Sequence, residues 1–244
     1  MKFFEDCQVQ YDDCDETKNL KLSSMIDKLM EVSEHQLEGT LGSTQTMLKK
    51  GIGWVVTQYE FHIQRLPKAL ENVKLWTDPI GYNRFLCYRD FGIQNEEGQD
   101  IVLVHSQWVL FDIKNRKMLP TDLNIVKDLG IPKLSKMPRF ARLRALDNYD
   151  TFNTYRVRYY DLDTNHHMTN GHYFNWIVDT LDRKFLNTHQ PVRIDLKFEQ
   201  EVKYGDNAQA RLKVENVDEF VKTSHLITVD DNNMAICEIE WGAR

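Results

Sequence analysis

Long apolar runs and paired cysteines are both missing from this 244-residue sequence. No stretch approaches the roughly 18 apolar residues that a membrane-spanning helix needs. The N-terminus becomes acidic at Glu5 and Asp6, before the apolar core of a signal peptide can form. The 4 cysteines have neither metal-ligand nor C-x-x-C spacing, and a chain of this length does not need a disulfide framework. These absences indicate a reduced, globular protein of the cytoplasm.

An excess of positive charge is also missing. The chain has 31 Lys and Arg against 37 Asp and Glu, so its net charge of −6 makes nucleic acid an improbable partner. Apolar residues make up 41% and charged residues 28%, which is ordinary for a folded protein and unlike a disordered one. The length allows one large domain or two small ones.

What the sequence does contain is a weak internal repeat. Residues 9–15 (VQYDDCD) match residues 157–163 (VRYYDLD), and each segment precedes apolar residues at helical spacing. The second of these helices has apolar residues on several faces, so we expect it to be buried all round. The residues that define the two patterns are Leu22, Met25, Ile26, Leu29 and Val32, and then Tyr173, Trp176, Ile177, Leu181 and Phe185.

Alternating β-type segments follow each helix in the same order. They lie at 54–63, 69–77 and 101–111 in the first half, and at 192–202, 208–215 and 234–241 in the second. Gly98 and the run Asp230–Asn233 are typical of hairpin turns. A helix that is apolar all round requires a sheet wrapped about it. We therefore predict an α+β fold of two similar units, 1–116 and 151–244, joined by a linker over 117–150.

The segment before the second helix carries the residues best suited to chemistry. Asp163, Asn165 and His167 alternate there, and alternate residues of an extended chain point to the same side. A helix N-terminus adds unpaired backbone N–H groups and a partial positive charge. Such a set is suited to polarising a carbonyl group and delivering a proton.

This pattern resembles the acyl-acyl-carrier-protein (acyl-ACP) thioesterases. The motif D-x-N-x-H-x-x-N of that family occurs at 163–170, and residues 197–202 (KFEQEV) resemble the family segment in which a strand supplies a further acid, here Glu201. The resemblance covers essentially the whole chain and points to the bacterial branch. It implies a tandem (double) hotdog fold, two long helices each wrapped by an antiparallel β-sheet, and hydrolysis of fatty acyl-ACP without a metal or an organic cofactor.

The resemblance also implies roles for the motif. Asn165, together with a backbone N–H of Asn170 or Gly171, would polarise the thioester carbonyl. Either His167 or Glu201 would be the general base. Asp163 would hold the loop, or simply cap the helix. The plant branch has a cysteine directly after the glutamate, whereas this chain has Val202, so a cysteine nucleophile at this place is excluded and water remains.

The first half lacks the equivalent set, because residues 13–18 contain neither Asn nor His. By resemblance that half would supply the acyl pocket, with Met25, Leu29 and residues 54–63 as candidates. The linker is basic, and it would attract an acidic carrier protein and its phosphopantetheine phosphate. The candidate docking residues are Lys133, Lys136, Arg139, Arg142 and Arg144.

Alternatives remain at this point. An acyl-CoA thioesterase would use the same residues, and hotdog folds also serve as non-catalytic acyl-binding proteins. A metal site at His167 and His172 with His166 is disfavoured, because His167 and His172 are not spaced to share a helix face and no acid or cysteine completes the set. The residues leave open the acyl chain length and the choice between a monomer of fused units and a homodimer.

Overall fold

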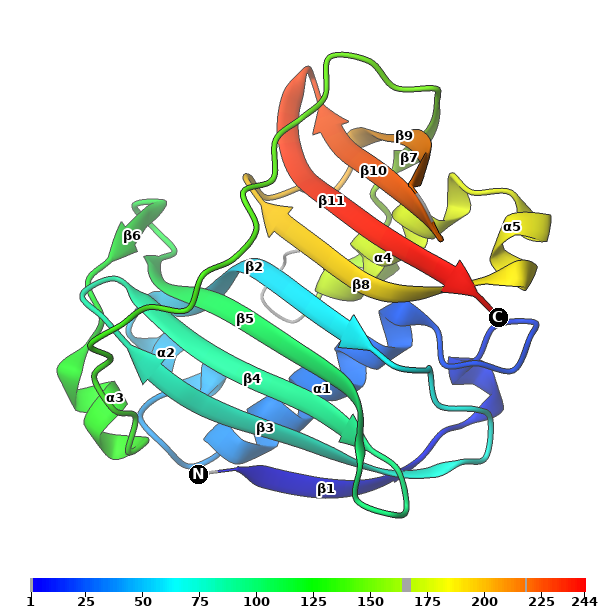
Figure 1. Cartoon of the computed structure of the whole chain (residues 1–244). Coiled ribbons are helices and arrows are strands. Elements are labelled where there is room, and N and C mark those ends of the chain that lie inside the picture. Colours follow the sequence, from blue (N-terminus) through cyan, green and yellow to red (C-terminus); the bar gives the residue numbers. More distant parts are fainter. Residues whose placement is uncertain (1, 164–167, 218) are drawn as a thin grey trace.

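The computed structural model describes residues 2–163, 168–217 and 219–244. Within these residues the strands form an 11-stranded sheet with the order β1-β3-β4-β5-β2-β8-β11-β10-β9-β7, and β6 pairs with β5 outside this path. Figure 1 shows both halves of the sheet and the two longer helices behind them. The elements of the first half are β1 (Phe3–Gln8), η1 (Tyr11–Asp13), α1 (Leu22–Leu37), α2 (Thr44–Lys49), β2 (Ile52–Ile63), β3 (Asn72–Tyr82), β4 (Leu86–Gln94), β5 (Asp100–Asp112), β6 (Lys117–Leu119) and α3 (Leu123–Asp128).

The second half repeats this plan. Its sheet order β7-β9-β10-β11-β8 mirrors β1-β3-β4-β5-β2, and each half has a helix between its first two strands. The halves join where β2 and β8 pair antiparallel, from Gln58 opposite Lys197 to His62 opposite Arg193. The predicted repeat and the double hotdog fold are confirmed. The elements are β7 (Thr151–Arg156), η2 (Tyr159–Asp161), α4 (Asn170–Asp179), α5 (Arg183–Thr188), β8 (His189–Phe198), β9 (Asn207–Val217), β10 (Phe220–Val229) and β11 (Asn232–Ala243).

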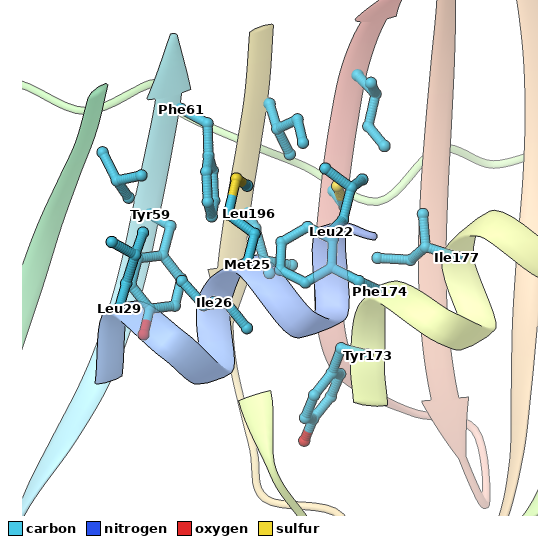
Figure 2. Close-up of a cluster of buried hydrophobic side chains, with 14 of the residues drawn as sticks. Leu22, Met25, Ile26, Leu29, Tyr59, Phe61, Tyr173, Phe174, Ile177 and Leu196 are labelled. Atoms are coloured by element: carbon cyan, nitrogen blue, oxygen red, sulfur yellow. The ribbon is translucent and has the colours of Figure 1, made fainter. Parts of the chain in front are cut away.

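The main core lies between the two longer helices and the concave face of the sheet. The apolar positions of α1 fall on one side because they recur at helical spacing, and they meet α4 and the two central strands (Figure 2). Each fully buried side chain of this kind contributes roughly 1.5–3 kcal/mol. Figure 2 labels Leu22, Met25, Ile26 and Leu29 of α1, Tyr59 and Phe61 of β2, Tyr173, Phe174 and Ile177 of α4, and Leu196 of β8.

The second helix differs from the prediction in two ways. It ends at Asp179, and a separate helix, α5, follows after Asp182, whose side chain accepts a hydrogen bond from the backbone N–H of Lys184 at 2.7 Å. This capping bond favours a new helix start rather than a continuation of the old helix. Asn175 and Asp179 are exposed on α4, so the helix is not buried all round. The expectation of one long, fully buried helix was therefore wrong.

The two predicted hairpin turns are confirmed. Gly98 has a φ of 76° between β4 and β5. Between β10 and β11, Asp230 and Asp231 have φ values of 46° and 63°. Positive φ at both central residues is what a two-residue type I′ hairpin requires, and Asp tolerates it better than most residues.

The predicted linker begins with β6 and α3, and then becomes a strap, residues 130–150, that crosses the outer face of the sheet (Figure 1). Leu134 packs so closely on Gly81 that a Cβ there would lie 2.3 Å from its Cγ atom. Phe140 stacks on Tyr88 at 6.3 Å, and the side chain of Gln58 donates a hydrogen bond to the Ala141 carbonyl at 2.8 Å. The strap therefore lies on the sheet face opposite α1 and α4. None of the described helices has the length and apolarity to cross a membrane.

Candidate functional site

Asp161 anchors the segment that leads into the predicted catalytic motif. It is 2% exposed, and its carboxylate accepts hydrogen bonds from the backbone N–H of Arg158 at 2.8 Å and from the Arg158 guanidinium at 2.9 Å. His172 of α4 contacts the same carboxylate, with Nε2 2.9 Å from Oδ1. Burial alone would raise the pKa of Asp161, but the hydrogen bonds from Arg158 and the charge of His172 hold it below its usual value. The carboxylate thus ties η2 to the first turn of α4.

The backbone closes the motif at its base. Leu162 and Met168 form an antiparallel bridge, and the N–H of Thr169 donates to the Asp161 carbonyl at 2.9 Å. Asp163 is partly buried just inside this bridge. Asn165 and His167, together with His166, lie outside the described residues. The chain on either side of residues 163–167 is therefore brought together immediately before α4.

Helix α4 begins where the motif ends. Thr169 is the N-cap and makes no side-chain capping bond, and Asn170 is the first helical residue. At Gly171 an added Cβ would lie 2.6 Å from Oδ1 of Asp27 on α1, so only glycine allows this approach of the two helices. The predicted donors, the backbone N–H groups of Asn170 and Gly171, are in the first turn, where a helix has no internal partners for them. Their position is consistent with the predicted role.

Glu201 comes close to α4 through a loop, not a strand. Strand β8 ends at Phe198, so the expectation that a strand carries this acid was wrong. Burial raises the pKa of the Tyr173 hydroxyl, near the start of α4, and the backbone of Val202 and the charge of Glu201 are near enough to affect that pKa as well. The Tyr173 ring packs edge-to-face on Phe198 at 4.9 Å. These contacts hold the β8–β9 loop, and Glu201 with it, against the start of α4.

Arg116 forms an ion pair with Glu201 across the two halves. It lies in the turn between β5 and β6 with a φ of 53°, and its guanidinium lies 5.3 Å from the Phe111 ring centre. The Glu201 side chain is 20% exposed. A partly buried carboxylate next to a guanidinium is stabilised in its ionised form. The first half thus supplies a cation to the candidate acid of the second half.

Sequence reasoning missed both Arg116 and Asp161 as site residues. For Arg116 no local signal exists, because it lies 85 positions from Glu201. For Asp161 the internal repeat held a signal. Asp13 occupies the matching position in the first half, and its carboxylate likewise accepts from the backbone N–H three residues before it, Gln10, at 3.3 Å.

In the first half the segment that matches the motif, residues 13–18, uses its carboxylates for contacts within the fold. Asp13 forms an ion pair with Lys28 of α1 at 2.8 Å. Asp15, the counterpart of Asp163, accepts hydrogen bonds from the backbone N–H groups of Thr17 at 2.8 Å and Asn19 at 3.0 Å. Its carboxylate is therefore used to close its own loop.

Two other kinds of chemistry find no support in the described residues. The cysteines are all unpaired, and burial raises the pKa of Cys87 to about 11 and that of Cys237 well above its usual value, so these thiols are poorly ionised. No group of three or more His, Cys, Asp or Glu is placed to hold a metal ion in the part of the chain that the structure describes.

The predicted pocket residues lie inside the protein, and the predicted docking residues lie on its surface. Met25 and Leu29 are both 0% exposed and are packed in the main core. A pocket does occur further along α1, and Trp54 of β2 lines it. The basic residues of the strap are all exposed, on the sheet face away from α4. They are Lys133, Lys136, Arg139, Arg142 and Arg144.

Known proteins resemble this chain in both sequence and fold. A Lactobacillus plantarum protein with the provisional name oleoyl thioesterase is 34% identical, with a TM-score of 0.96 over 100% of this chain and 96% of its own. The 12:0-ACP thioesterase from Umbellularia californica shares the fold, with 17% identity and a TM-score of 0.89 over 100% of this chain and 94% of its own. A chloroplastic palmitoyl-acyl carrier protein thioesterase from Gossypium hirsutum is 25% identical over 208 residues. That match covers 78% of this chain and 50% of the relative, so the chain spans about half the length of the curated relatives that it matches.

Two family models cover nearly all of the chain. The acyl-ACP thioesterase N-terminal domain matches residues 1–129, and the acyl-ACP thioesterase C-terminal domain matches residues 145–243. The two matches fall on the two halves of the double hotdog. The chain belongs to the acyl-ACP thioesterase family.

Proposed function

We propose that this protein hydrolyses the thioester of fatty acyl-ACP to a free fatty acid and the carrier protein. The observation that carries the proposal is the convergence of three elements at the first turn of α4. These are the closed base of the 163–170 motif, the backbone N–H groups of the first helical turn, and the β8–β9 loop with Glu201. Family membership over both halves agrees with it.

In the proposed reaction the carbonyl oxygen of the thioester accepts hydrogen bonds from Asn165 and from a backbone N–H of Asn170 or Gly171. The water oxygen attacks the carbonyl carbon and forms a tetrahedral oxyanion, which these donors stabilise. One such donor typically contributes ~10²–10³ in rate. The C–S bond then breaks, and the pantetheine thiolate takes up the proton that the base removed from water.

We assign the general base to His167 and an orienting role to Glu201. The Glu201 carboxylate is paired with the Arg116 guanidinium, which suits a group that orients the base. A neutral imidazole titrates near the working pH, and a carboxylate nearby favours the charged imidazolium formed during attack. Asp163, at the base of the motif, would hold the loop that carries Asn165 and His167.

The first test is release of free thiol by the wild-type protein from a matched set of acyl-ACP and acyl-CoA thioesters. We expect acyl-ACP to be cleaved with the higher kcat/KM. Preference for acyl-CoA would favour the alternative of an acyl-CoA thioesterase. If the folded protein binds acyl chains but cleaves neither thioester, it is an acyl-binding protein and the hydrolase proposal fails.

We further propose that the exposed cations of the strap attract the acidic carrier protein. The strap lies on the sheet face away from α4. Lys114 lies in the β5–β6 turn and Lys117 begins β6, so both lie close in sequence to Arg116, which pairs with Glu201. These two groups of cations define two directions from which a carrier can approach. Long-range attraction acts mainly on the association rate and is screened by salt.

Reversing the charge of each group of cations in turn distinguishes the two directions from which the carrier protein can approach. Changing Lys136, Arg139 and Arg142 to Glu should raise KM for acyl-ACP about tenfold at low salt, because it removes the attraction for an acidic partner. Hydrolysis of a small thioester without a carrier should not change. The matched control reverses Lys114 and Lys117. If the control raises KM and the strap variant does not, docking occurs at the turn.

The compartment and the oligomeric state of the protein are inferred from the cysteines and from the pairing of the two halves. All of its cysteines are unpaired thiols, which supports a reducing compartment, and we propose the cytoplasm. The two halves of one chain already form the interface that single hotdog units form by dimerising. A monomer can therefore hold the complete site, and a homodimer would need a second interface elsewhere on the surface. Sedimentation at enzyme-assay concentration distinguishes these two states.

A further inference from the structure

A carboxylate of the first half, Asp27 of α1, lies against the start of α4. Its Oδ1 and Oδ2 atoms lie 2.6 and 2.8 Å from the position that a Cβ on Gly171 would take, so the carboxylate covers this glycine directly. Asp27 is exposed, whereas its neighbour Ile26 is 0% exposed in the main core. Asp27 therefore lies at the surface of the contact between the two helices, beside one of the two proposed carbonyl donors.

The groups around Asp27 come from β2 and from the first turn of α4. Burial raises the pKa of the Tyr59 hydroxyl, and the charge of Asp27 raises it further. The same hydroxyl accepts a hydrogen bond from the Asn170 side chain at 3.4 Å. Partial burial raises the pKa of Asp27 itself, and the charge of His172 acts in the opposite direction. These interactions place the carboxylate beside the turn where the thioester carbonyl is proposed to bind.

Within the described residues, the Asp27 carboxylate makes neither a hydrogen bond nor an ion pair. An ionised carboxylate only accepts hydrogen bonds, so the group that completes it is a donor. Because like charges repel, the carboxylate is unsuited to bind the oxyanion that forms on the reacting carbonyl. The group that Asp27 is suited to bind is therefore a donor on another part of the substrate.

An acyl-ACP has few donors near its thioester. An unsubstituted alkyl chain, the carbonyl group and the sulfur have no N–H or O–H. The first donor is the amide N–H of the pantetheine arm, which an ethylene group separates from the sulfur. The arm runs outward from the site, because the folded carrier protein stays at the surface. With the carbonyl held at Gly171, an outward path for the arm passes the exposed Asp27.

We propose that Asp27 binds the pantetheine arm by accepting a hydrogen bond from the amide N–H next to the sulfur. This inference rests on the proposed hydrolysis of acyl-ACP, and it adds a residue of the first half to the contacts with the substrate. A hydrogen bond to a charged group is stronger than one between neutral groups, so its loss is measurable in kcat/KM. A carboxylate at this place also interacts favourably with the dipole of α4, but that effect does not depend on the arm.

The first test compares two arms that differ in one group. Acyl-ACP is prepared with the natural arm, and with an analogue in which an ester oxygen replaces the amide N–H next to the sulfur and cannot donate. For the wild-type protein we expect kcat/KM to be tenfold or more higher with the natural arm. A ratio near one overturns the inference. If acyl-ACP with the natural arm is not cleaved at all, the proposed function itself fails.

Asp27→Ala provides the second test, because it removes the acceptor and should reduce the ratio between the two arms to less than twofold. Asp27→Leu, which has nearly the shape of the wild-type side chain, should do the same. Asp27→Asn keeps an acceptor oxygen without the charge, and we expect it to retain a ratio of at least threefold. If Asp27→Ala and Asp27→Leu slow both arms equally and keep the wild-type ratio, Asp27 acts on the water or on the helix dipole, and the inference is overturned.

Glu31→Ala is the matched control. Glu31 is an exposed carboxylate one turn further along α1, where its charge acts on Lys28 and His35. Its loss should leave the ratio between the two arms as in the wild type. An equal fall of the ratio in Glu31→Ala and Asp27→Ala would mean that the general charge of α1, and not the Asp27 acceptor, distinguishes the arms, which contradicts the inference.

Discussion

Replacing Asn165 or His167 by alanine is expected to lower kcat for acyl-ACP hydrolysis by about two orders of magnitude or more. Loss of a carbonyl-polarising donor typically costs ~10²–10³ in rate, and loss of a general base ~10²–10⁴. Both residues belong to the motif whose ends the structure closes at Leu162 and Met168. The measurement is steady-state thiol release, with circular dichroism spectra to show that each variant is folded.

The matched control for these variants is His166→Ala, the neighbouring position in the sequence. His166 has the same side chain as His167 but fills a position that the D-x-N-x-H pattern leaves unspecified, so its loss should change kcat less than threefold. Equal losses in His166→Ala and His167→Ala would mean that disturbance of the segment, and not loss of the His167 imidazole, is responsible. A near-normal rate in Asn165→Ala would place the carbonyl donors elsewhere.

The second large effect is expected on stability, from Phe174→Ala. Phe174 of α4 is 0% exposed and meets Phe61 of β2 edge-to-face at 5.5 Å, between the two helices and the central strands (Figure 2). Truncating a buried phenylalanine costs the transfer free energy and leaves a cavity, about 3–5 kcal/mol in total. We expect the free energy of unfolding in urea to fall by that amount. The two halves should unfold together, because they share one sheet.

Phe152→Ala is the control, because it removes the same atoms from a side chain of β7 that is 56% exposed. It should change the free energy of unfolding by about 0.5 kcal/mol or less. A loss below about 1 kcal/mol for Phe174→Ala would mean that the core closes over the cavity at little cost. Separate unfolding transitions for the two halves would show that the β2–β8 pairing does not couple them.

Several features of this protein follow from the sequence alone because their causes are local. The helical spacing from Leu22 to Val32 predicts α1, since apolar side chains at that spacing share one face. The Asp230–Asp231 turn follows from residue types that tolerate positive φ. The internal repeat predicts two similar units. The D-x-N-x-H-x-x-N motif indicates the family, and its position in the second half indicates which unit carries the candidate site. The same local logic extended the second helix too far, since apolar residues continue past Asp179 whereas the capping bond of Asp182 interrupts the helix.

Only the tertiary structure decided the surroundings of the site. Arg116 reaches Glu201 because the β5–β6 turn of one half meets the β8–β9 loop of the other, and no periodicity records such a meeting. The approach of Asp27 to Gly171 likewise depends on how α1 and α4 cross. Arg89 reads in sequence as one more charged strand residue, and it becomes a buried cation in a pocket only when α1 covers that part of the sheet. Periodicity and turn chemistry act within a few residues, whereas ion pairs and pockets depend on packing between distant segments.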